Sequence, residues 1–77
     1  GFEVDLIVGD MNLALEFKSA TKIRSTHLKG LKTLLEEHNV GHALLISQDP
    51  EHRKTQDGIE MIYWKNFCEQ LWQGKWI

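Results

Sequence analysis

Cysteine, proline and long apolar runs are all scarce in this 77-residue chain. The only cysteine is Cys68, so no intramolecular disulfide can form, and a reducing, cytoplasmic setting is expected. No apolar run is long enough to cross a bilayer and no charged-then-apolar leader opens the chain, so we expect neither a membrane partner nor export. The chain opens at Gly1 and enters a predicted strand almost at once, so we interpret residues 1–77 as a single excised domain fragment.

An excess of basic charge is also missing. Nine Lys and Arg residues stand against eleven Asp and Glu residues, a net charge of -2. Any contact with DNA must therefore come from a local patch. Between residues 17 and 35 the chain has basic residues and no acidic one, and these include three candidate nucleic-acid contacts: Lys22, Arg24 and Lys29. A phosphate near the start of the helix predicted there would explain this pattern, and so would a solvated helix face that tolerates a small misfit with the helix dipole.

Two segments near the start of the chain alternate between apolar and polar residues. The alternation runs over residues 2–8 and 13–18, and a period of two predicts strands. The short segment 9–12 between them is rich in turn formers, which predicts an antiparallel hairpin. The same alternation predicts that Val4 and Val8 lie on one face of the hairpin.

The rest of the chain predicts an α/β fold with a mixed sheet in the order β-β-α-β-β-α. An uninterrupted apolar run, followed later by another strand, is typical of a parallel sheet with a right-handed helical crossover. The expected elements are a helix from Ser25 or Thr26 that stops near Asn39 and Gly41, a strand over 43–46, a loop over 49–57, a strand over 59–63 and a helix over about 65–73 that Gly74 ends.

Asp5, Glu16 and Lys18 form the constellation that could carry chemistry. If the hairpin closes at residues 9–12, Asp5 lies opposite Glu16, with Cβ atoms about 4.5–5.5 Å apart. Two carboxylates at this distance repel each other unless a cation lies between them. Mg²⁺ is commonly held by one or two protein carboxylates together with waters and substrate oxygens. Lys18 is predicted on the same face as Glu16, where its ammonium could neutralise the acids and position a water.

At these residues the chain resembles the PD-(D/E)xK, or restriction-endonuclease-like, nuclease superfamily. The matching segments are EVDLIV at 3–8 and ALEFKS at 14–19. The resemblance implies Asp5 and Glu16 as ligands of Mg²⁺ or Mn²⁺, the Phe17 carbonyl as a third ligand, and Lys18 as the residue that orients the attacking water. It also implies that residues 1–77 lack the N-terminal helix and the first strand of the superfamily core. The acidic residue that this helix usually carries is therefore missing as well.

A narrower resemblance covers nearly the whole chain. The segments HLKGLKTLLEEH, LLISQDPEHR and DGIEMIYWKNFCEQLW are similar to the C-terminal domain of unknown function in bacterial and archaeal predicted AAA-type ATPases. This resemblance implies an ATPase domain upstream. It leaves two functions open: a Mg²⁺-dependent nuclease module acting on DNA, or a non-catalytic domain that regulates an ATPase and forms a homodimer through an exposed strand edge.

Several other residues predict structure rather than chemistry. Cys68 falls on the apolar stripe of the last helix, which predicts a small buried side chain. The tryptophans near the C-terminus predict packing in preference to a platform for bases. No cysteine pair accompanies the four histidines, so a zinc site is not expected. Asp49 and Arg53 predict a loop ion pair worth under about 1 kcal/mol if exposed.

Overall fold

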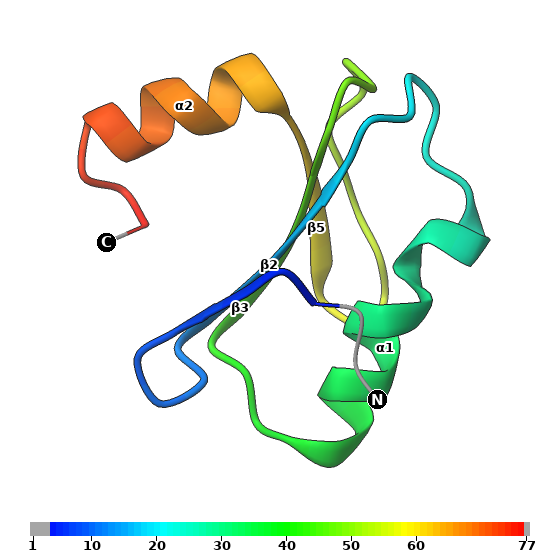
Figure 1. The fold of residues 1–77 in the computed structure, drawn as a ribbon, viewed down its shortest axis with the longest axis vertical. Coiled ribbons are helices and arrows are strands. Elements are labelled where there is room, and N and C mark those ends of the chain that lie inside the picture. The colour runs from blue at the N-terminus through cyan, green and yellow to red at the C-terminus, as the bar shows by residue number, and fades with distance from the viewer. Residues whose placement is uncertain (1–3, 77) are drawn as a thin grey trace.

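A five-stranded mixed sheet with a helix on each face makes up this domain, for which the computed structural model describes residues 4–76 (Figure 1). The strand order is β1-β2-β3-β5-β4, with β2, β3 and β5 parallel and the two outer strands antiparallel to their neighbours. The elements are β1 (Leu6–Val8), β2 (Leu13–Lys18), the 3₁₀-helix η1 (Ser25–Leu28), α1 (Lys29–Glu37), β3 (His42–Ser47), β4 (Arg53–Lys54), β5 (Ile59–Tyr63) and α2 (Trp64–Trp72).

The central strand β3 confirms the prediction made from its apolar run. Residues 43–47 are all buried, because β3 lies between β2 and β5 and has side chains packed on both faces. The crossover through α1 makes β2 and β3 parallel, as expected for a helix between two strands of one sheet. The α/β class and the mixed sheet are therefore confirmed.

Each face of the sheet carries its own apolar core. On one face, strand residues such as Ala14 and Leu45 pack with Leu31 and Leu34 of α1. On the other face, Phe67 of α2 belongs to a cluster with residues from β2, β3 and β5: Leu13, Leu15, Leu44, Ile46 and Ile62. Alternation along β2 therefore sends successive side chains to different helices.

Strand β1 is shorter than the predicted strand over residues 2–8. Phe2 and Glu3 lie outside the described residues, and Asp5 forms a bend before β1 begins. Val4 packs against the core on the α1 face, whereas Val8 packs against the core on the α2 face. The prediction that these two valines share a face is thus wrong, because the bend interrupts the alternation. The predicted register is confirmed from Leu6, which lies opposite Leu15.

The segment before α1 also differs from the prediction. A 3₁₀ turn begins at Ser25, and neither Ser25 nor Thr26 acts as the N-cap of the helix. Instead, the Arg24 backbone N–H donates to His27 Nδ1 at 2.9 Å. The α-helix proper starts only at Lys29.

Two corrections concern the second half of the chain. The predicted loop over 49–57 contains β4, a two-residue strand that pairs with β5 and is too short to produce an alternation. Helix α2 buries only Phe67, while Cys68, Leu71 and Trp72 are exposed, Trp72 to 93%. The predicted burial of Cys68 and packing of Trp72 are wrong, because α2 contacts the sheet over a small area and projects from it (Figure 1). In residues 4–76, no helix combines the length and apolarity needed to cross a membrane.

Candidate functional site

Glu16 is a buried carboxylate in the middle of β2. Its side chain is 2% exposed and lies on the face of Ala14, toward α1. Glutamate is rarely buried to this extent without a charged partner. Lys18 supplies one: its Nζ lies 3.1 Å from Glu16 Oε2. The strand therefore brings the outer two residues of the Glu-x-Lys tripeptide into contact on one face.

Asp5 reaches the same tripeptide in a different way from the one predicted. It precedes β1, so the expected ladder pair with Glu16 is not formed; the ladder begins at Leu6. The Asp5 N–H donates a hydrogen bond to the Leu15 carbonyl at 3.0 Å. Asp5 Oδ2 accepts a hydrogen bond from the Phe17 N–H at 2.7 Å. The exposed Asp5 carboxylate is thus anchored to the residue between Glu16 and Lys18.

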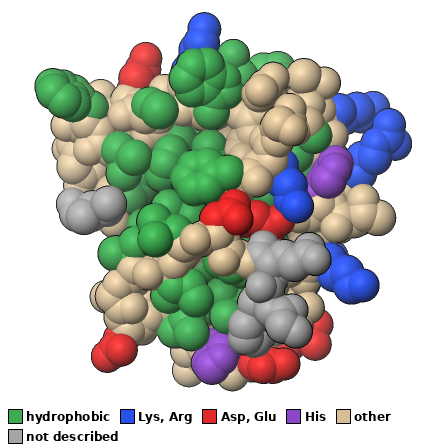
Figure 2. Space-filling model, viewed as in Figure 1, with side chains coloured by type: hydrophobic (Ala, Val, Ile, Leu, Met, Phe, Trp, Pro, Cys, Tyr) green, Lys and Arg blue, Asp and Glu red, His purple; other side chains and the backbone are tan. Residues whose placement is uncertain are grey.

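The space-filling view shows the result. Acidic atoms lie near the centre of the face that Figure 2 shows, with a Lys or Arg side chain beside them. Apolar side chains cover much of the surface on one side of these atoms, and basic and other polar side chains lie on the other side (Figure 2). The charged group therefore lies beside an apolar region, and the charge–charge interactions of its buried member, Glu16, are screened less than on a fully solvated surface.

The three metal ligands that the resemblance implies all supply oxygen atoms. Asp5, Glu16 and the Phe17 carbonyl are the ligand types that Mg²⁺ prefers, and Mg²⁺ usually completes its shell with water and substrate. Within residues 4–76 there is no group of three or more His, Cys, Asp or Glu side chains suited to a metal ion. The four-ligand geometry of a structural zinc site is therefore not offered by the described residues.

Lys22, Arg24 and Lys29 form a second group. All three are exposed. Lys22 and Arg24 lie on the connection between β2 and η1, and Lys29 is the first residue of α1. Figure 2 shows several basic side chains gathered on one side of the molecule. α1 begins without an acidic residue in its first turn and ends without a basic one in its last. Three of the nine Lys and Arg residues thus lie in one short stretch beyond the end of β2, with no acidic residue between them.

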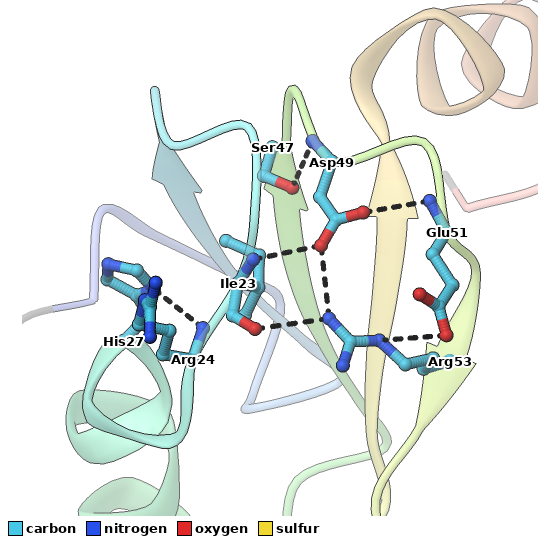
Figure 3. Close-up of polar contacts among 7 residues, drawn as sticks. All are labelled: Ile23, Arg24, His27, Ser47, Asp49, Glu51 and Arg53. Atoms are coloured by element: carbon cyan, nitrogen blue, oxygen red, sulfur yellow. Dashed lines mark hydrogen bonds and ion pairs between the residues drawn. The ribbon is translucent and has the colours of Figure 1, made fainter.

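Asp49 is the residue whose importance the sequence did not reveal. It is 6% exposed. Its carboxylate accepts hydrogen bonds from the Ile23 N–H at 2.8 Å, from the Glu51 N–H at 2.9 Å and from the Arg53 guanidinium at 3.0 Å (Figure 3). The same guanidinium donates to the Ile23 carbonyl at 3.2 Å. The predicted ion pair with Arg53 forms, but Asp49 is buried, so the pair is more than an exposed loop contact. This network holds the segment that carries Lys22 and Arg24 against the end of β3.

Backbone donors set the charge state of Asp49. The Ile23 N–H, followed by the Glu51 N–H, lowers the pKa of the Asp49 carboxyl below its ordinary value; Arg53 lowers it further, and burial opposes them. The carboxylate is therefore the form that the fold requires.

Comparisons with protein-family models, with curated proteins and with solved structures find no match to this chain. What is established is a small α/β domain with a five-stranded mixed sheet and two α-helices.

Proposed function

We propose that this chain is a metal-dependent phosphodiesterase module of the PD-(D/E)xK type that acts on DNA with Mg²⁺ or Mn²⁺. One observation carries the proposal: a buried Glu16 contacts Lys18, and the Asp5 carboxylate binds the backbone between them. Carboxylates that bind a divalent cation, with an amine that positions a water, could together support cleavage of a phosphodiester. The succession of hairpin, helix and parallel strand supports a restriction-endonuclease-like core.

Each residue of the site has its own role in this proposal. Asp5, Glu16 and the Phe17 carbonyl would hold the cation, which would lower the pKa of a water and offset charge on the phosphate. Lys18 restrains the buried carboxylate of Glu16 and positions the attacking water. Lys22 and Arg24 contact phosphates of the flanking strand, which fixes its register without reading its sequence.

Metal binding tests the proposal directly. Mn²⁺ is titrated into the wild type, into Asp5→Asn and into Glu69→Gln, and binding is followed by calorimetry. We expect Asp5→Asn to weaken binding by about 10-fold or more, in line with the loss of one charged oxygen ligand. Glu69 is exposed on α2, so Glu69→Gln should bind as the wild type does. Equal, negligible binding by wild type and Asp5→Asn contradicts the proposal.

A second function is favoured by the edge strand β1. Leu6 is 47% exposed and Ile7 41% exposed, and β1 forms one edge of the sheet among the described residues. Exposed apolar edges pair readily with another chain. The alternative is therefore a non-catalytic interaction domain that forms a homodimer through β1 and regulates an ATPase domain of the same protein.

A further inference from the structure

A pocket of about 470 Å³ opens where three parallel strands end. β2 ends at Lys18, β3 at Ser47 and β5 at Tyr63. In open α/β sheets, ligands bind outside the carboxyl ends of the strands, and the volume falls within the range of about 300–1,000 Å³ typical of small-ligand sites. The residues that line the pocket include Phe17, Lys18, Ser19, Ile46, Gln48 and Trp64.

Two aromatic rings stand on the walls of this pocket. Phe17 is 49% exposed and Trp64 44% exposed, although both are large apolar side chains. The Phe17 ring packs edge-on against the buried Phe67, with centroids 6.2 Å apart. The Trp64 ring packs against Tyr63, also at 6.2 Å. Each ring thus rests against a second aromatic ring while close to half of it stays exposed.

Two lysines lie beside these rings. Lys18 lines the pocket and also contacts Glu16, so the pocket adjoins the cluster proposed to cleave a phosphodiester. Lys65 Nζ lies 5.6 Å from the centroid of the Trp64 ring. Aromatic faces next to lysines are the combination that binds single-stranded nucleic acid, because bases stack on the rings while the amines contact phosphates.

We infer that this pocket takes one unpaired nucleobase of a single-stranded nucleic acid, stacked on Trp64 and Phe17, next to the phosphate that the cluster acts on. The inference rests on the proposed function and names its substrate class. In a duplex, both faces of a base are covered by its neighbours, so a paired base cannot enter the pocket without first being unstacked and flipped out, which costs binding energy. A base in a single strand or at an unpaired end can.

Binding of a labelled single strand in EDTA tests the inference without the metal. The probes are a short fluorescein-labelled oligothymidylate and an abasic strand with the same number of phosphates, measured by anisotropy. We expect Trp64→Ala to weaken binding of the oligothymidylate by between about 5-fold and 150-fold, the contribution of stacking on one ring. Trp64→Phe, which keeps a ring, should restore most of the affinity. The control is Trp72→Ala, since Trp72 is 93% exposed near the other end of α2.

The abasic strand separates the contribution of base stacking to the affinity from the contribution of phosphate charge. We expect it to bind wild type and Trp64→Ala equally and weakly, and a fully paired duplex to gain nothing from Trp64. Equal affinity of wild type and Trp64→Ala for the oligothymidylate overturns the inference, and so does equal affinity of the wild type for the base-containing and abasic strands. Because EDTA removes the cation, failure of Mn²⁺ binding at Asp5 leaves this result intact, and the two proposals fail separately.

Discussion

At the residue scale, Asp49 shows how much one buried carboxylate can organise. It accepts hydrogen bonds from two backbone N–H groups and from Arg53. Asp49→Asn removes the charge and turns an NH₂ group toward these donors, so we expect a loss of about 1–3 kcal/mol in the free energy of unfolding. Urea denaturation measures it. Asp57→Asn is the matched control, because the Asp57 side chain is 53% exposed and lies 3.7 Å from Lys32; its cost should stay within about 0.5 kcal/mol.

The Asp49 carboxyl also makes the free energy of unfolding depend on pH. Its pKa is lowered in the folded chain, chiefly by the Ile23 and Glu51 N–H groups. The unfolded chain therefore binds the proton first, at about pH 4, and the stability from Asp49 is complete above that pH and lost as the pH falls through the lowered value. We expect the difference in Tm between wild type and Asp49→Asn to shrink between pH 6 and pH 3. A difference that stays constant over that interval speaks against a charged Asp49 in the network.

At the element scale, the connection from α1 to β3 is packed against the hairpin turn. The Gly41 N–H donates to the Met11 carbonyl at 2.9 Å, and the His42 N–H to the Asn12 carbonyl at 2.8 Å. A Cβ atom on Gly41 would lie 2.5 Å from the Asn12 carbonyl oxygen. We expect Gly41→Ala to destabilise the fold by about 1–3 kcal/mol, because backbone must move to admit the methyl group. Asn39→Ala, an exposed change in the same connection, should be close to neutral, and thermal unfolding compares the two.

At the scale of the whole molecule, β1 leaves an apolar sheet edge at Leu6 and Ile7. We expect the chain to self-associate through this edge, and light scattering should give a mass that rises with concentration. Ile7→Lys places a charge on the edge and should shift the chain to monomer. Trp72→Lys, on α2 rather than on β1, should leave the mass unchanged. A strict monomer at high concentration contradicts dimerisation through β1.

The local elements could be predicted because their signals lie within short segments. Alternation over 13–18 and the apolar run at 43–46 identify β2 and β3, which the structure confirms. The bend at Asp5, the two-residue β4 and the 3₁₀ start of α1 escaped prediction. Each depends on a hydrogen bond or strand pairing with a segment that a short window does not contain, or on a turn too short to leave a period.

The candidate site, too, could be predicted only in part. Glu16 and Lys18 share a face because a strand has a period of two, and the order of residues alone determined that. Only the packed chain decided that Glu16 is buried, that Asp5 binds the Phe17 N–H, that Asp49 is enclosed and that Trp72 is left in solvent. Burial and pocket shape come from contacts between residues far apart in the chain, and periodicity within one segment carries no information about them.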